Sequence, residues 1–241
     1  MNIQPAEKRQ GGDGATLDVQ SIFPTIQGEG PFTGQRAVFV RLAGCNLLCP
    51  ACDTDYTSNR RIETVDYIIG RVKEMFEEGV LVVITGGEPF RQNLGPLVTK
   101  LVNDGHRVQV ETNGTLPPSE GIPALVEYNL RASRGCFIVC SPKAGKVNPE
   151  LEPLICAYKY VLSCDSVSHI DGLPLQVLDH GAVPRVARPH LNFIGPVYLQ
   201  PRDDRPGHHA KNSRHLEAVV NSCLRHGHIL QLQIHKIIGV E

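Results

Sequence analysis

The sequence of 241 residues contains no apolar run long enough to cross a membrane, which takes about 20 residues. Its first stretch, MNIQPAEKRQGGDGATL, lacks the apolar segment of a secretory signal. The formal net charge of -1 also lacks the basic excess expected of a nucleic-acid coat or a polybasic membrane anchor. We therefore predict a cytoplasmic protein with neither a nucleic acid nor a membrane as partner.

The chain shows no internal repeat or low-complexity block. Residues 1–16 are rich in Gly, Gln and charged side chains, which predicts a flexible leader outside the fold. Hydrophobic residues make up 41% of the chain and charged residues 20%, as in ordinary globular proteins. We therefore expect residues 17–241 to form a single domain.

Cysteine is comparatively abundant, with eight residues and no export signal. This combination indicates a reducing compartment, where thiols serve as metal ligands or small buried side chains rather than forming disulfides. We expect the second role for the scattered residues Cys136, Cys140, Cys156, Cys164 and Cys223.

Short apolar, β-branched runs alternate with helical patterns along the chain. The runs lie at 17–23, 37–43, 80–84, 106–111, 136–140, 157–163, 197–200 and 229–234. Apolar residues at helical spacing occupy 64–78, 93–104 and 211–226, and a glycine stands at or next to the end of each segment. Strands that alternate with helices predict parallel βαβ units in an open sheet or barrel.

Polar clusters stand at the ends of five of these apolar runs. They read TGGEP after residue 84, ETNGT closing the run 106–111, SPK after 140, QPRDD after 199 and HK after 234. Any one cluster could be turn chemistry. In parallel α/β folds, however, ligands bind at the carboxyl ends of strands, so the clusters together predict one shared site.

The segment CNLLCPACDT places Cys45, Cys49 and Cys52 within one short loop, with no fourth ligand close by. A structural zinc site normally closes with four protein ligands. On a [4Fe–4S] cluster, by contrast, three cysteines leave one iron open for an exogenous ligand. S-adenosylmethionine (SAM) could bind that iron through its amino and carboxylate groups, and reductive cleavage would then give a 5′-deoxyadenosyl radical.

Neighbouring motifs suit the same cofactor. Gly86 and Gly87 expose backbone at a strand end, where a charged amino group can approach carbonyl groups, and Glu88 adds negative charge. Ser141 and Lys143 offer hydrogen-bond donors for ribose hydroxyls or a carboxylate.

The motifs CNLLCPAC and TGGEP resemble those of the radical SAM superfamily. Together with TIQGEG, ETNGT, CSPK, YLQP and LQIHKIIG, the sequence resembles the 7-carboxy-7-deazaguanine synthase family from about Leu17 to Glu241. The resemblance implies a partial, open β/α barrel that converts 6-carboxy-5,6,7,8-tetrahydropterin to 7-carboxy-7-deazaguanine with loss of ammonia, on the route to 7-deazapurines such as queuosine. It further implies a [4Fe–4S] cluster, SAM and Mg²⁺ as cofactors, a flavodoxin- or ferredoxin-type electron donor, and a homodimer.

The resemblance also implies residue roles. Cys45, Cys49 and Cys52 correspond to the cluster ligands and Thr54 to the Mg²⁺ contact. The substrate-binding positions are Ile26, Gln27, Gly28, Glu29, Arg41, Thr85, His235 and Glu241. The SAM-binding positions are Ala51, Asp53, Gly87, Glu88, Glu111, Ser141, Pro142, Lys143, Gln200, Pro201, Arg202 and Asp203.

Other interpretations of these residues stay open. Taken singly, Thr54 could be a capping hydroxyl, Arg41 an ion-pair arginine and His235 a buried core histidine. A glycyl-radical-activating enzyme also carries this cysteine spacing after GCNL and would act on a protein partner. A non-catalytic module that binds zinc through the thiols is the alternative of another class.

Overall fold

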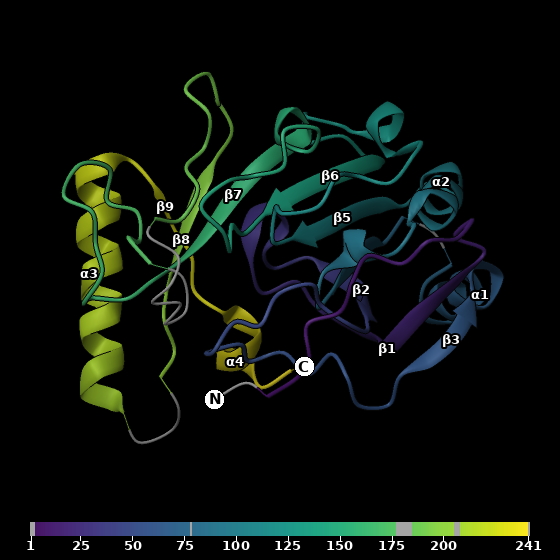
Figure 1. The fold of residues 1–241 in the computed structure, drawn as a ribbon, viewed down its shortest axis with the longest axis horizontal. Helices are drawn as coiled ribbons and strands as arrows, with labels where there is room; N and C mark the ends of the chain where they lie inside the picture. Colours follow the sequence, from purple (N-terminus) through teal and green to yellow (C-terminus); the bar gives the residue numbers. More distant parts are fainter. Residues whose placement is uncertain (1–2, 78, 177–184, 205–207, 241) are drawn as a thin grey trace.

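One continuous sheet organises the computed structural model, which describes residues 3–77, 79–176, 185–204 and 208–240. The strands follow the order β3-β1-β2-β4-β5-β6-β7-β8-β9 in a sheet that curves without closing (Figure 1). They are β1 (Thr16–Ile26), β2 (Arg36–Leu42), β3 (Arg61–Thr64), β4 (Leu81–Gly86), β5 (Arg107–Thr112), β6 (Gly135–Cys140), β7 (Ile155–Leu162), β8 (Val197–Pro201) and β9 (Ile229–Leu230). The fold is thus a partial, open β/α barrel, as predicted.

From β2 to β9 every neighbouring pair of strands is parallel. The predicted parallel arrangement is therefore confirmed for this part of the sheet. β1 instead pairs antiparallel with both β2 and β3. β3 was not predicted, because its residues RIET are mostly exposed at the sheet edge and contain no apolar run.

The main helices are α1 (Val65–Met75), α2 (Gly95–Asn103) and α3 (His209–His226), close to the predicted positions. The hydroxyl of Thr64 caps α1 by accepting a hydrogen bond from the Tyr67 N–H at 3.1 Å. The helix ends earlier than predicted, at Met75, because Phe76 adopts an extended backbone. Short 3-10 turns also occur, at Gly30–Phe32, Pro89–Arg91, Ile122–Leu125 and Glu152–Leu154.

The prediction of a strand over 229–234 is only partly right. Pairing stops after Leu230, and a short helix α4 (Ile234–Ile238) follows. The backbone N–H of Gln231 still bonds Leu199 of β8 at 2.8 Å, while its side-chain oxygen accepts from the Gly30 N–H at 2.7 Å and its amide donates to the Gly28 carbonyl at 3.2 Å. The chain is thereby drawn toward the loop after β1 instead of continuing along β8.

Apolar side chains pack on both faces of the sheet. On one face Val38, Val82 and Ile84 belong to the larger cluster that also includes Ile68 of α1 and Leu97 of α2. On the other face Phe32 and Phe137 meet edge to face, with ring centroids 4.9 Å apart, in a smaller cluster. Burial on both faces explains why these strands read as nearly continuous apolar runs.

Among the described helices, none has the length and apolar character that crossing a membrane would require. Of the scattered cysteines, Cys136, Cys140 and Cys156 are buried as predicted. Cys164 and Cys223 are half-buried, because they lie after β7 and near the end of α3, where the core thins.

Candidate active site

A cavity of about 1220 Å³ opens at the carboxyl edge of the parallel strands. All five predicted clusters contribute to its wall. Four of them follow parallel strands, whose carboxyl ends share one edge, whereas HK lies in α4. The predicted site residues that line it are Ile26, Gln27, Glu29, Arg41, Cys45, Cys49, Ala51, Cys52, Asp53, Thr54, Thr85, Gly87, Glu111, Ser141, Lys143, Gln200, Pro201, Arg202, Asp203 and His235.

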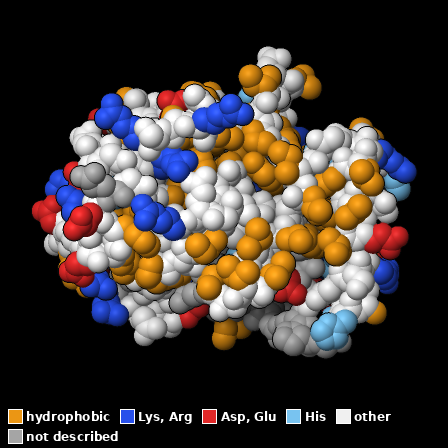
Figure 2. All heavy atoms as spheres, turned by 180° about the vertical axis from the view of Figure 1, so that it is seen from behind, with side chains coloured by type: hydrophobic (Ala, Val, Ile, Leu, Met, Phe, Trp, Pro, Cys, Tyr) orange, Lys and Arg blue, Asp and Glu red, His pale blue; other side chains and the backbone are white. Residues whose placement is uncertain are grey.

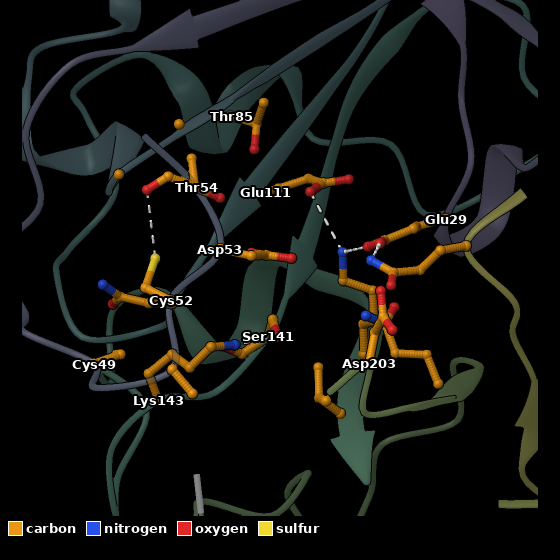
Figure 3. Close-up of a pocket in the computed structure, with 18 of the residues that line it drawn as sticks. Glu29, Cys49, Cys52, Asp53, Thr54, Thr85, Glu111, Ser141, Lys143 and Asp203 are labelled. Atoms are coloured by element: carbon orange, nitrogen blue, oxygen red, sulfur yellow. Dashed lines mark hydrogen bonds and ion pairs between the residues drawn. The ribbon is translucent and has the colours of Figure 1, made fainter. Parts of the chain in front are cut away.

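The cysteine loop forms one side of this cavity (Figure 3). Its base is closed by a hydrogen bond from the Gly44 N–H to the Tyr56 carbonyl at 2.8 Å. The pKa of the Cys45 thiol is raised to about 12, chiefly by burial and in smaller part by the nearby Glu88, Cys49 and Cys52. Without a bound cation these side chains are therefore neutral thiols, and metal binding would release their protons.

The TGGEP motif packs directly under the cysteine loop. A Cβ atom on Gly87 would lie 2.1 Å from the Gly44 carbonyl oxygen and 2.9 Å from the Cys45 Cβ, so only glycine fits there. The next N–H, of Glu88, donates to that same Gly44 carbonyl at 3.1 Å. The two loops are thus held in fixed register at the place where the first cysteine projects.

The carboxylate of Glu88 is fully buried and turned away from the cavity. It accepts hydrogen bonds from the Asn113 N–H at 2.7 Å, the Thr112 hydroxyl at 2.8 Å and the Phe90 N–H at 3.0 Å. Burial raises the Glu88 pKa to about 7, although these hydrogen bonds oppose the shift. The Glu88 side chain, for which the sequence analysis expects a SAM contact, thus joins the TGGEP and ETNGT loops and does not line the cavity.

A buried charge cluster that the sequence analysis did not single out lies across the cavity from the cysteine loop. Lys159 of β7 is 7% exposed and forms a short ion pair with Glu29, and its Nζ lies 3.4 Å from a Glu111 oxygen. Glu29 also accepts from the Gln233 amide at 2.7 Å, and Glu111 accepts from the Gln109 amide at the same distance. Figure 3 shows Glu29 and Glu111 turned toward this shared lysine.

Electrostatics keeps this cluster charged. Burial alone would raise the pKa of Glu29, but the Lys159 ammonium outweighs it and the pKa lies at about 2. Burial likewise opposes the charge of Lys159, while Glu111 and Glu29 raise its pKa above the ordinary value. One cation between two carboxylates leaves surplus negative charge facing the cavity, which suits a ligand edge rich in N–H donors.

The signal for Lys159 is present in the sequence, in the run AYKYVLS. A lysine flanked by aromatic residues inside a buried strand must be paired, and the acidic residues of the QGEG and ETN motifs are its partners.

Helix α4 closes another side of the cavity. Gly28 makes room for the His235 ring, since a Cβ on Gly28 would lie 2.0 Å from the His235 Nδ1. Lys236 bonds Asp203 at 2.8 Å and lies 3.9 Å from Asp53 of the cysteine loop. Gly28, for which the sequence analysis expects a substrate contact, does not line the cavity, and its missing side chain leaves the space that the His235 ring occupies.

Comparison with known proteins identifies the family. Residues 40–134 match the model of the Radical SAM superfamily. The 7-carboxy-7-deazaguanine synthase of Rhodospirillum rubrum is 42% identical over 98% of this chain and 97% of its own. The chain belongs to the 7-carboxy-7-deazaguanine synthase family.

Further relatives agree. The 7-carboxy-7-deazaguanine synthase of Rickettsia prowazekii is 38% identical over 95% of this chain and 91% of its own. The crystal structure of QueE from Escherichia coli has a TM-score of 0.64 at 22% identity, covering 90% of this chain and 94% of that one, and supports the fold. Membership of this family outweighs the activating-enzyme and zinc-module alternatives that the cysteine spacing alone allows.

As a member of the 7-carboxy-7-deazaguanine synthase family, the chain is a radical SAM enzyme with a [4Fe–4S] cluster and SAM as cofactors. The loop fits such a cluster, because its three thiols line one side of the cavity. No three His, Cys, Asp or Glu side chains within the described ranges converge on a single metal-ion position. An iron–sulfur cluster does not require the three thiols to meet at one ion, since each cysteine binds a different iron.

Two groups on the wall remain available to SAM. The Gln200 side chain is 5% exposed, lines the cavity, and has no hydrogen-bond partner for its Oε1 among the described residues. Lys143 donates to the Ser141 hydroxyl at 2.6 Å, and burial lowers its pKa.

Pro142 borders a separate small hollow beside Tyr160 rather than the main cavity, unlike the prediction, and Glu241 lies outside the described residues.

Gly87→Ala should displace the cysteine loop, because the added Cβ has no space beneath Gly44. After anaerobic reconstitution we expect the variant to hold much less iron and acid-labile sulfide than the parent protein. Gly70→Ala is the matched control, since Gly70 lies in α1 with nothing within 4 Å of its Cβ position. Full cluster content in Gly87→Ala would contradict the close packing of the two loops.

Proposed function

We propose that this enzyme converts 6-carboxy-5,6,7,8-tetrahydropterin to 7-carboxy-7-deazaguanine and ammonia, on the route to 7-deazapurines such as queuosine. The observation that supports this most is the pairing, in one cavity, of a three-cysteine loop with the Lys159–Glu29–Glu111 cluster on the opposite side. When bound, the cluster and SAM supply the radical that removes a hydrogen atom from the substrate. The substrate has the same atoms as the product plus ammonia, so the ring contraction balances without a net oxidant or reductant.

The chain's own residues bind and orient the pterin in this proposal. Glu29 accepts hydrogen bonds from the N–H groups of its aminopyrimidinone edge, and the amides of Gln27 and Gln233 bind alongside. Glu111, for which the sequence analysis expects a SAM contact, is proposed here as a second acceptor on this edge because it shares Lys159 with Glu29. The guanidinium of Arg41 lies 5.0 Å above the Phe23 ring and lines the cavity, where it would receive the substrate carboxylate. Thr85, His235 and Ile26 line the same cavity.

SAM and the cluster would occupy the other side. Cys45, Cys49 and Cys52 would hold the cluster, which would leave one iron open to the amino and carboxylate groups of SAM. Ser141, Lys143 and Gln200 offer donors and acceptors to its polar groups. The remaining proposed SAM contacts are Ala51, Asp53, Gly87, Pro201, Arg202 and Asp203.

An anaerobic assay tests the reaction. The reconstituted protein is mixed with SAM, reductant, Mg²⁺ and the carboxylated pterin, and products are identified by mass spectrometry. We expect 7-carboxy-7-deazaguanine and ammonia from the parent protein and neither from Cys49→Ala. SAM cleavage to 5′-deoxyadenosine without that product would keep the radical chemistry and overturn the substrate. Reduced flavodoxin or ferredoxin in place of a chemical reductant tests the proposed electron donor.

Lys159→Met should raise the KM for the pterin by about tenfold or more, because the two carboxylates lose the charge-assisted bonds that orient them. Lys159→Arg should recover part of this loss. The control Lys100→Met removes an exposed lysine that pairs with the still more exposed Asp66 and should leave KM unchanged. If Lys159→Met keeps the parent KM with an unaltered circular dichroism spectrum, the cluster does not position the substrate.

We also propose a Mg²⁺ ion between the Thr54 hydroxyl and the substrate carboxylate. Mg²⁺ prefers oxygen ligands and retains water, so one neutral protein oxygen beside a substrate carboxylate is a sufficient site. Thr54 lines the cavity next to the cysteine loop, which supports this position. Thr54→Ala should weaken the stimulation of turnover by Mg²⁺ more than it weakens SAM binding. An identical Mg²⁺ titration for both proteins would argue against Thr54 as the contact.

We propose further that the enzyme is a homodimer and works in the cytoplasm, where its thiols stay reduced. Leu191 and Ile194, almost fully exposed, lie in the segment that protrudes before β8, and hydrophobic side chains gather on and below this protrusion (Figure 2). Leu191→Asp combined with Ile194→Asp should shift sedimentation toward the monomer. Ile62→Asp, an exposed position on β3 at the far edge of the sheet, is the control and should leave it unchanged.

A further inference from the structure

Residues 4–10, predicted to be part of a flexible leader, lie along the cysteine loop instead. Ala6 pairs with Cys45 in a parallel bridge, and the Glu7 N–H donates to the Cys45 carbonyl at 2.7 Å. The Gln10 N–H donates to the Arg91 carbonyl, also at 2.7 Å. The prediction of a leader outside the fold differs from the structure for these residues, because their backbone groups find partners on the loop.

Gln4 reaches the other end of the same loop. Its side-chain oxygen accepts from the Tyr56 N–H at 2.7 Å, and its amide donates to the Thr54 carbonyl at 2.9 Å. The segment is therefore bonded to Cys45 on one side of the thiols and to Thr54 and Tyr56 on the other. Cys45 is itself the first point of attachment, and Cys49 and Cys52 lie between it and the second.

The buried side chain of Arg91 contacts both this segment and the start of the cysteine loop. The Arg91 side chain is 1% exposed and donates to the Ala43 carbonyl at 3.0 Å, and its charge meets Glu7 at 3.2 Å and Asp18 at 3.5 Å. Its guanidinium also fills the space under Gly44, where a Cβ would lie 2.5 Å from Nη2. Glu7 also pairs with Arg60 at 2.8 Å. Removing the Glu7 charge therefore takes one partner from each arginine and loosens the Arg91 guanidinium beneath the first cysteine, while Asp18 and the Lys8 carbonyl still satisfy the buried charge.

We infer that residues 4–10 form a clasp that holds the cysteine loop in its cluster-binding shape, with Gln4, Glu7 and Arg91 as positioning residues. The clasp acts on the retention of iron and not on a substrate contact, since Gln4 and the Glu7 N–H bond the backbone of the loop and the Glu7 carboxylate pairs with Arg91 and Arg60. This inference rests on the cluster that the thiols bind, and it is independent of which substrate the enzyme uses.

The test compares full-length Glu7→Gln and Gln4→Ala with the parent protein after anaerobic reconstitution. Each variant is exposed to a ferrous chelator, and iron release is followed by absorbance. We expect release about tenfold faster from both, the effect of losing one or two hydrogen bonds to a charged or buried group. The thermal midpoint of each apoprotein should stay close to that of the parent.

The controls separate a clasp from general weakening. Glu74→Gln breaks an exposed ion pair with Arg71 on α1 and should release iron at the parent rate. Iron release at the parent rate from both Glu7→Gln and Gln4→Ala would overturn the clasp. Faster release together with a lower thermal midpoint of the apoprotein would also overturn it, because the whole fold would then be weakened and not the loop alone. Because no substrate is present, failure here differs from failure of the turnover assay, and Cys49→Ala reports separately on the cluster itself.

Discussion

Parallel register is the constraint on which the site depends. From β2 to β9 the strands run in one direction, so each contributes its carboxyl end to the same edge of the sheet. Motifs that are far apart in the sequence are thereby gathered around one cavity. The open sheet also leaves a gap at that edge, which the cysteine loop and α4 border.

Within this frame, buried charge fixes the positions of the loops. Glu88 joins two strand-end loops, Lys159 joins the QGEG and ETN motifs, and Arg91 joins the chain start to the cysteine loop. Burying any of these groups without a partner would cost free energy, so each group and its partners are held within bonding distance. Such preorganisation suits radical chemistry, in which a reactive intermediate must meet one substrate hydrogen atom and exclude others.

The sequence predicts the parallel strands and the convergence of their polar ends because periodicity and strand-end chemistry are local signals. It does not predict the strand β3, whose residues are exposed, or the turn at Gln231, which depends on contacts with Gly28 and Gly30. The same difference between local and long-range signals applies to the site residues. The cysteine spacing can be recognised in the sequence, whereas the burial of Glu88 and the pairing of Lys159 arise only when distant segments meet.

The glycines that face bulky side chains have an evolutionary consequence. Gly28 leaves room for the His235 ring, and Gly44 leaves room for the Arg91 guanidinium. A side chain at either glycine can be accommodated only if its distant partner becomes smaller at the same time. Among relatives that conserve this architecture, positions 28 and 235 should therefore vary together or remain fixed together, and so should 44 and 91.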